Sequence, residues 1–221
     1  MKRLFLLLGL VALGAFAIAQ EPAAKLLYAD FEKLSKENRP ISNREGQIVF
    51  DSNAPNPSSK PKINPRMFGA QAPLTQRLGF EFDIPENPWA EASMKIIGMK
   101  DKGRLDDWAK TLLVKSEDVG GYKNLSIDLG AAGVTQLRLR VISEGNGVDA
   151  GTAHPEKIIT VTSSLQNYKI ALTDFKQPTG DWVTKKVTTD QVLKKLTGIQ
   201  ISVTQAPSKG IVIADNIAFE K

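Results

Sequence analysis

Few side chains in this 221-residue sequence could carry out catalysis. His154 is the only histidine, and Pro155 follows it, so a Ser-His-Asp arrangement has a single possible base without an evident partner. The sequence contains no G-x-S-x-G turn and no glycine-rich phosphate-binding loop. We therefore expect that replacing His154 with alanine leaves the function nearly unchanged.

Pairs of carboxylates are the other residues with catalytic potential. Glycoside hydrolysis needs two acids that face each other across a cleft, one of them with a raised pKa. Adjacent residues such as Asp106 and Asp107 point in different directions in an extended segment. All three pairs are expected on the solvated surface, and the protein is not expected to be an enzyme. The pairs are Glu81 with Asp83, Asp106 with Asp107, and Glu117 with Asp118.

Two consecutive segments with strong alternation, 122–130 and 135–143, form the best candidate binding surface. Their apolar residues fall on one face at period two, and the short link 131–133 predicts that they pair as a hairpin. The opposite face would then present polar and aromatic side chains together on one sheet. These are Tyr122, Asn124, Asp128, Gln136, Arg138 and Arg140.

Such a set of side chains suits a sugar. An aromatic plane can cover the C–H face of a sugar ring, while amide, carboxylate and guanidinium groups bond its hydroxyls. Trp108 and Trp182 have polar neighbours and could add stacking surfaces, whereas Trp89 precedes an apolar strand and is expected in the core at a sheet end. The alternative is an ordinary solvated sheet face.

Most of the remaining chain reads as short strands. Alternating or continuous apolar segments bounded by polar turns favour an all-β, two-sheet antiparallel sandwich. The predicted strands, besides the two above, are 25–32, 47–50, 77–84, 91–99, 110–115, 157–162, 166–175, 198–204 and 210–221.

Two segments depart from this pattern. Residues 188–198 predict one short helix, because Thr188 and Gln191 have the spacing of a capping box and Gly198 can end the helix. Residues 51–76 contain five prolines and predict a long proline-rich loop.

The first residues and the composition indicate the compartment. Residues 1–19 have a basic start, an apolar core and an Ala17-Ile18-Ala19 cleavage signal, so they predict a signal peptide and a secreted or periplasmic protein. The remaining 202 residues (221 − 19), 20–221, suit a single domain without membrane insertion. Without Lys2 and Arg3 the formal charge falls from +5 to +3 (5 − 2), which is weak support for nucleic-acid binding, and no such binding is expected.

Four stretches in a familiar order point to a family. They are "LLYADFE" (26–32), "EDVGGYKNLSIDLG" (117–130), "QNYKIALTDF" (166–175) and "KKLTGIQISV…GIVIADNIAFE" (194–220). Together they resemble the galactose-binding-like jelly rolls found in many non-catalytic carbohydrate-binding modules. One departure is the absence of a tryptophan just before "YKIAL", where this chain has Leu165-Gln166-Asn167.

The resemblance implies an exported, non-catalytic domain that binds a polysaccharide or cell-envelope glycan. Some members of this superfamily bind no sugar and serve in assembly. The alternative is therefore a structural domain of the envelope that binds a protein partner.

The resemblance also implies a place for a structural calcium ion, because the first and last strands of such jelly rolls commonly meet at one. Asp30 and Glu32 share a face of the first strand. In the last strand, period-two alternation predicts that Asp215 shares one apolar face with Ile211, Ile213, Ile217 and Phe219. Three carboxylates suit calcium, whereas zinc and copper are poorly served by a chain with no cysteine and one histidine. Alternatively, Asp215 caps a turn or bonds backbone N–H groups at a bulge, with Asn216 doing the same.

Overall fold

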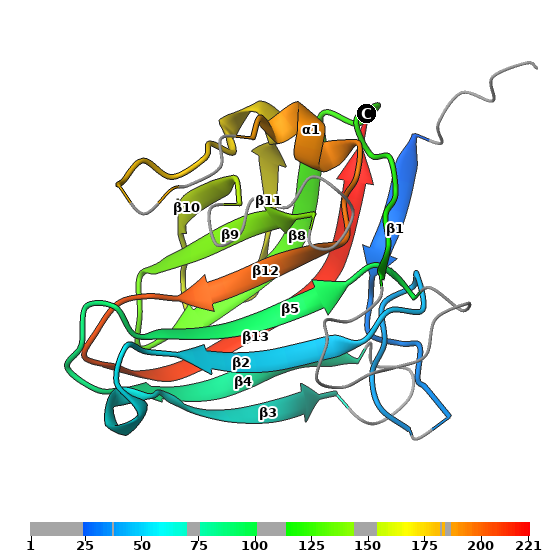
Figure 1. The fold of residues 1–221 in the computed structure, drawn as a ribbon. Helices are drawn as coiled ribbons and strands as arrows, with labels where there is room; N and C mark the ends of the chain where they lie inside the picture. The colour runs from blue at the N-terminus through cyan, green and yellow to red at the C-terminus, as the bar shows by residue number, and fades with distance from the viewer. Residues whose placement is uncertain are drawn as a thin grey trace, which may run out of the picture.

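The computed structural model describes residues 24–36, 38–69, 76–100, 114–143, 154–181, 183 and 187–221. The predicted signal peptide, residues 1–19, lies outside the described residues. Two antiparallel sheets pack face to face, with the five-stranded sheet in front of the six-stranded sheet in Figure 1. The predicted all-β sandwich is thereby confirmed. No helix in the described ranges is long and apolar enough to cross a bilayer.

The six-stranded sheet has the order β11-β8-β13-β4-β3, with β1 also paired to β13. Its strands are β1 (Lys25–Ala29), β3 (Lys62–Phe68), β4 (Arg77–Ile84), β8 (Asn124–Ala132), β11 (Gln166–Ala171) and β13 (Ser208–Glu220).

The five-stranded sheet has the order β10-β9-β12-β5-β2. Its strands are β2 (Ile48–Asn53), β5 (Glu91–Ile97), β9 (Gln136–Ile142), β10 (Glu156–Thr160) and β12 (Gly198–Val203). Two short strands, β6 (Met99–Lys100) and β7 (Val114–Lys115), pair separately.

The core lies between the two sheets and follows the predicted alternation. Phe80 and Phe82 of β4 point inward and are 0% and 2% exposed, while Glu81 between them faces outward. Leu125 of β8 and Leu139 of β9 meet the same core from opposite sheets. Every second residue of the facing strands is therefore free to build an outer surface.

The helix begins as predicted but is shorter. In α1 (Thr189–Leu193), Thr188 Oγ1 accepts a hydrogen bond from the Gln191 N–H at 3.2 Å, and Gln191 Oε1 accepts one from the Thr188 N–H at 2.8 Å. This pair of bonds confirms the capping box. The helix ends before Leu196, because the backbone of Leu196 pairs with Glu117.

The predicted loop 51–76 was wrong for residues 62–68, which form β3. A proline is tolerated at Pro65 because β3 is an edge strand paired only with β4, so no ladder bond is needed on its other side. A 3₁₀ turn, η1 (Pro57–Ser59), precedes it. A second such turn, η2 (Leu172–Asp174), follows β11.

The predicted hairpin of 122–130 and 135–143 was also wrong. β8 lies between β11 and β13, and β9 lies between β10 and β12, so the two strands belong to different sheets. The chain crosses between the sheets at Gly133, whose φ is +88°, and a Cβ there would lie 2.0 Å from the Lys209 carbonyl oxygen. Both strands still turn their apolar faces to the core, but their outer faces lie on opposite sides of the molecule.

Tyr122 does not face outward as predicted. It precedes β8, is 9% exposed, and its ring lies 6.2 Å from the ring of Phe219, centroid to centroid. Phe219 also contacts Tyr28 edge to face at 5.6 Å. Tyr122 therefore belongs to an aromatic group in the core.

β13 changes face at Asp215. Asp215 pairs with Asp128 and Ala218 pairs with Ser126, so β13 contains one extra residue, and Asn216 takes a left-handed conformation with φ +47°. Val212 and Ala214 point inward before this bulge, and Ile217 and Phe219 point inward after it. The prediction that Ile211 and Ile213 share a face with Ile217 was therefore wrong.

Asp215 is fixed by the bulge itself. Its Oδ1 accepts the Asn216 N–H at 2.8 Å, which confirms the alternative of a carboxylate bonded to backbone at a bulge. The residue is 2% exposed, and Arg77 Nε lies 3.9 Å from Oδ2. Burial raises the pKa of Asp215 to about 6, and the nearby Asp128 adds to the rise, while the Asn216 N–H opposes it.

We predict that Asp215→Asn raises stability at pH 7.5 but not at pH 4. Because the folded-state pKa lies near 6, folded protein holds a proton that the unfolded chain releases between about pH 4 and 6, so the free energy of unfolding falls as pH rises through that window. Asp215→Asn carries no charge and should not show this fall, so its free energy of unfolding at pH 7.5 should exceed that of wild type by at most about 3 kcal/mol. Urea unfolding across pH 4–8 measures the free energy of unfolding of both proteins.

Asp83→Asn is the control for this experiment, because Asp83 is an exposed carboxylate whose side chain is 47% accessible. It should leave the shape of the pH profile unchanged. An Asp215→Asn protein with the wild-type profile would contradict the assignment.

We further predict that Tyr122→Ala lowers the free energy of unfolding by about 2–4 kcal/mol, because it removes a ring packed against Phe219. Tyr122→Phe keeps the ring and should cost less than about 1 kcal/mol. Denaturant titration separates the two. If Tyr122→Ala were as stable as wild type, the assignment of Tyr122 to the core would be wrong.

Candidate functional site

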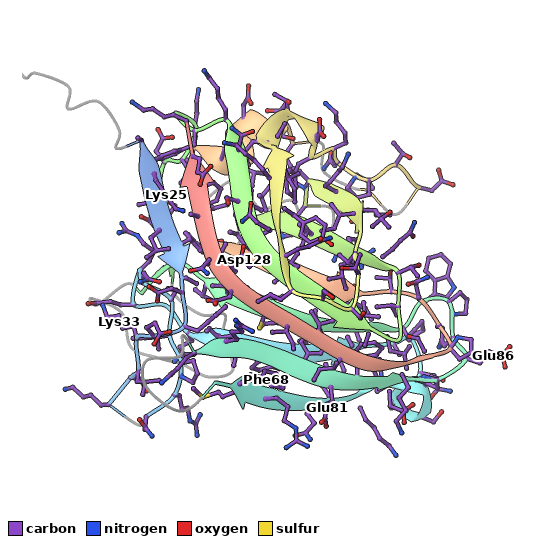
Figure 2. The ribbon with its side chains drawn as sticks, turned by 180° about the vertical axis from the view of Figure 1, so that it is seen from behind. Lys25, Lys33, Phe68, Glu81, Glu86 and Asp128 are labelled. Atoms are coloured by element: carbon purple, nitrogen blue, oxygen red, sulfur yellow. The ribbon has the colours of Figure 1, made fainter. Side chains whose placement is uncertain are left out.

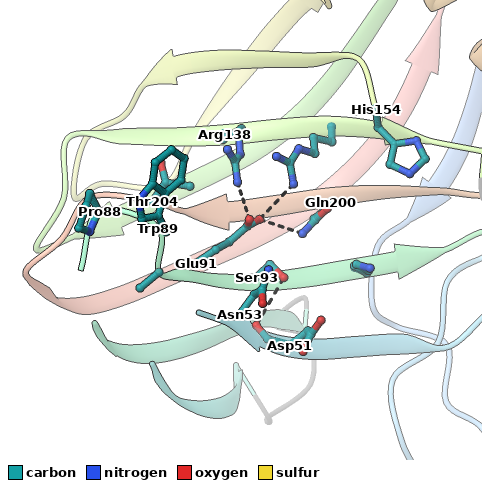
Figure 3. A pocket seen from close by; sticks show the side chains of 13 residues that line it. Asp51, Asn53, Pro88, Trp89, Glu91, Ser93, Arg138, His154, Gln200 and Thr204 are labelled. Atoms are coloured by element: carbon teal, nitrogen blue, oxygen red, sulfur yellow. Dashed lines mark hydrogen bonds and ion pairs between the residues drawn. The ribbon is translucent and has the colours of Figure 1, made fainter. Parts of the chain in front are cut away.

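A pocket of about 560 Å³ lies on the outer face of the five-stranded sheet. Alternation turns Met94 of β5 and Ile201 of β12 into the core, and their neighbours outward. Figure 3 shows the pocket between Trp89 and Thr204 at one end and His154 at the other. The lining comes from β2, β5, β9 and β12, from the turn before β5, and from single residues just before β10 and just after β12. It consists of Asp51, Asn53, Pro88, Trp89, Ala90, Glu91, Ser93, Lys95, Arg138, Arg140, His154, Gln200 and Thr204.

Glu91 joins three strands at the centre of this pocket. Its Oε1 accepts hydrogen bonds from Gln200 Nε2 at 3.0 Å and from Arg140 Nη1 at 3.4 Å, and its Oε2 accepts one from Arg138 Nη2. These three donors converge on the carboxylate in Figure 3. β5, β9 and β12 are thus linked by side chains as well as by their ladders.

Glu156 of β10 forms ion pairs with the same two arginines from the neighbouring strand. Its Oε2 accepts from Arg140 Nε at 3.0 Å and lies 3.6 Å from Arg138 Nε. All four charged side chains are only 12–19% exposed. The guanidinium planes are therefore held in place between two carboxylates.

The pKa of Glu91 reflects this environment. Burial alone would raise it, but the positive charges of Arg138 and Arg140 outweigh burial and hold the pKa below its usual value. Glu91 is therefore an ionised acceptor at neutral pH. A carboxyl with a lowered pKa does not suit the general acid of a glycosidase.

Trp89 supplies an apolar surface beside these polar groups. It is 71% exposed, so the prediction that it packs in the core was wrong. The reason is the turn before β5: Asn87 Oδ1 accepts the Trp89 N–H at 2.9 Å, and Ala90, 1% exposed, takes the buried position. Ile158 of β10, directly opposite Arg138 and 54% exposed, adds a second apolar side chain on the same face.

Of the predicted ligand residues that the structure describes, Arg138 and Arg140 alone line this pocket. Gln136 is exposed further along β9, where its N–H bonds to Gln205 Oε1, and it does not line the pocket. Tyr122 is in the core, as described above. Trp108 and Trp182 lie outside the described residues.

The other two predicted ligand residues, Asn124 and Asp128, lie in β8 of the opposite sheet. Asp128 Oδ1 accepts from Asn167 Nδ2 and Oδ2 from Asn216 Nδ2, both at 2.8 Å. Figure 2 shows Asp128 on that sheet from behind. The predicted surface is thereby divided between two faces.

Sequence reasoning missed Trp89, Glu91 and Gln200. Glu91 and Gln200 fall within predicted strands, so the sequence could have placed each on an outer face. Their contact could not be predicted, because it depends on β12 lying between β5 and β9. Trp89 carried a weaker signal, the Asn-Pro turn before it.

The three predicted calcium ligands do not gather in one cluster. The first and last strands do pair, with Ala29 opposite Ile217, but Asp30 turns to Asn43, whose Nδ2 donates to Asp30 Oδ2 at 3.1 Å. Glu32 accepts the N–H of Gln76 instead. Within the described ranges no three Asp, Glu or His side chains form a metal-ligand group, and calcium binding stays a prediction.

Comparisons with known proteins show similarity in fold but not in sequence. No protein-family model and no curated protein matches the sequence. Among solved structures, the chain is similar to the family 11 carbohydrate-binding module of a cellulosomal cellulase of Clostridium thermocellum, with 13% identity and a TM-score of 0.57 over 90% of this chain and 95% of that one.

A structure of the Clostridium thermocellum family 11 module in complex with a β-1,3-1,4-mixed-linked tetrasaccharide matches 89% of this chain and 95% of that one, with 16% identity and a TM-score of 0.53. An exo-β-agarase matches 90% of this chain but only 25% of its own, with 16% identity and a TM-score of 0.51. The resemblance to carbohydrate-binding modules is confirmed at the level of the fold, and the chain shares their β-sandwich architecture.

Proposed function

We propose that this protein is an exported, non-catalytic domain that binds a polysaccharide on the outer face of its five-stranded sheet. The observation that carries the proposal is the exposed Trp89 beside the fixed polar network of Glu91, Arg138, Arg140 and Gln200. A stacking surface and positioned hydrogen-bond groups are what a sugar ring with a rim of hydroxyls requires. The shared fold with carbohydrate-binding modules supports the same conclusion.

Binding would use the pocket along its length. A sugar ring would lie on the indole of Trp89, and its hydroxyls would bond to the exposed Asp51 and Asn53 of β2 and to the guanidinium groups of Arg138 and Arg140, which line the pocket. Because the arginines are already held by carboxylates, little side-chain entropy is lost when a sugar binds.

Export is part of this proposal and is supported by the sequence of residues 1–19, with its basic start, apolar core and A-x-A signal. A secreted or periplasmic location would place the pocket where polysaccharides and envelope glycans occur.

One observation favours the alternative, a domain that binds an envelope protein. A groove of about 370 Å³ lies at the open edge of the sandwich between β2 and β3. Its lining includes Ile48, Phe50, Pro65 and Met67, of which Met67 is 44% exposed, together with Arg39 and Arg66. An apolar groove between two edge strands suits a protein segment better than a sugar.

We predict that Trp89→Ala weakens binding to a polysaccharide at least about tenfold, because the ring contact is lost and 1.4 kcal/mol corresponds to a factor of ten. A glycan array on the mature protein, with calcium and with chelator, identifies the polysaccharide. Affinity electrophoresis in that polymer measures the loss and any dependence on calcium.

Met67→Ala is the matched control, since it truncates an exposed apolar side chain in the other groove. It should leave polysaccharide binding unchanged. Unchanged binding by Trp89→Ala together with loss by Met67→Ala would move the site to the β2–β3 groove.

A further inference from the structure

We propose that Glu91 and Glu156 determine the charge selectivity of this face: by neutralising Arg138 and Arg140, they make the site reject acidic polysaccharides. The inference rests on the proposed function, since it concerns the same pocket. It adds a role to two carboxylates that otherwise look like structural ion pairs.

The geometry distributes both negative charges over both positive charges. Glu91 contacts Arg138 through Oε2 and Arg140 through Oε1, and Glu156 contacts Arg140 at 3.0 Å and Arg138 at 3.6 Å. In the sheet, Glu156 stands directly opposite Arg140 on the neighbouring strand. Neither guanidinium therefore faces the pocket without a carboxylate beside it.

Burial makes this compensation effective. The four side chains are 12–19% exposed, so water and salt screen their charges less than at an open surface. A uronate or sulfate group that approaches the arginines would also approach Glu91 and Glu156. Its attraction to the guanidinium groups would be offset by repulsion from the two carboxylates.

The other charged side chains of the pocket do not disturb this balance of charge. Asp51 and Lys95 add one negative and one positive charge. Among the described side chains that line the pocket or pair with its arginines, three carboxylates thus balance three lysine and arginine side chains. The whole chain, in contrast, carries a formal charge of +5.

The test replaces each carboxylate with its neutral isostere. Glu91→Gln, Glu156→Gln and the double variant are compared with wild type by affinity electrophoresis in polygalacturonate, at 50 and 200 mM NaCl. We expect wild type to be little retarded, and Glu91→Gln to bind about tenfold more tightly at the lower salt concentration. The gain should shrink at the higher concentration, because it is electrostatic.

Glu81→Gln is the matched control. Glu81 Oε1 lies 3.0 Å from Arg66 Nε on the opposite sheet, so this variant also frees one arginine and changes the net charge equally. Figure 2 shows Glu81 on that sheet, and Glu81 does not line the pocket. An equal gain by Glu81→Gln and Glu91→Gln would show an effect of net charge alone and would overturn the inference, as would no gain in any pocket variant.

Two further variants keep the test decisive. Glu91→Gln with Arg138→Gln restores the charge balance and should remove the gain. If the carboxylate variants fail to fold in thermal melts, wild type and Arg138→Gln decide: retardation of wild type by polygalacturonate that Arg138→Gln abolishes would overturn the inference, and equal, weak retardation of both would support it.

The outcomes also separate this inference from the proposed function. Wild type that binds a neutral polysaccharide, with no gain for acidic polymer in the variants, would leave the proposed function standing and remove the selectivity role. A second outcome is that wild type binds no neutral polysaccharide, while Glu91→Gln binds acidic polymer more tightly than wild type whether or not Trp89 is present. That outcome would remove the proposed function and leave the selectivity role standing.

Discussion

The packing of two apolar sheet faces against each other is the constraint on which the rest of this structure depends. Each facing strand gives alternate side chains to the shared core, such as Met94 of β5 and Leu139 of β9. The intervening positions are then obliged to face outward, whatever their chemistry. On the five-stranded sheet these positions carry Glu91, Ser93, Arg138, Arg140 and Gln200, and the pocket is a by-product of the same alternation that fills the core.

The polar groups of that face stabilise one another at some cost. Four charged side chains that are mostly buried must lose hydration, and removal of one partner would leave a charge uncompensated. The cost is offset because every carboxylate meets two guanidinium groups and Glu91 also meets Gln200. The same mutual bonding holds the donors in fixed directions, which is the property a recognition surface needs.

The outcome on the two faces shows what can be predicted from a single sequence. Local alternation identified the inward residues of β4, β8 and β9, because the period of a strand is set by its own backbone. It did not identify which strands are neighbours, since that depends on contacts between distant segments. The sequence around Gly133 is compatible with a hairpin turn and also with a crossing between sheets. The structure has the crossing, because β8 pairs with β11 and β13 while β9 pairs with β10 and β12.

Single-residue features caused the other errors. The extra residue at Asn216 reverses the faces of β13 halfway along, so one period could not describe the whole strand. Trp89 looked like a core residue by type, but the bond between its N–H and Asn87 gives the inward place to Ala90. In both cases a local feature of the backbone, a bulge at Asn216 and a turn at Asn87, overrode the hydrophobic pattern.

The proline in β3 has a consequence for how the folded protein behaves at high concentration. β3 is the last strand of its sheet, and a free strand edge can pair with the edge of another molecule. Pro65 has no N–H to offer such a neighbour, and Lys62 adds an exposed positive charge to the same strand. Two copies brought together at this edge would lack the hydrogen bond of position 65, so the proline opposes self-association into extended sheets.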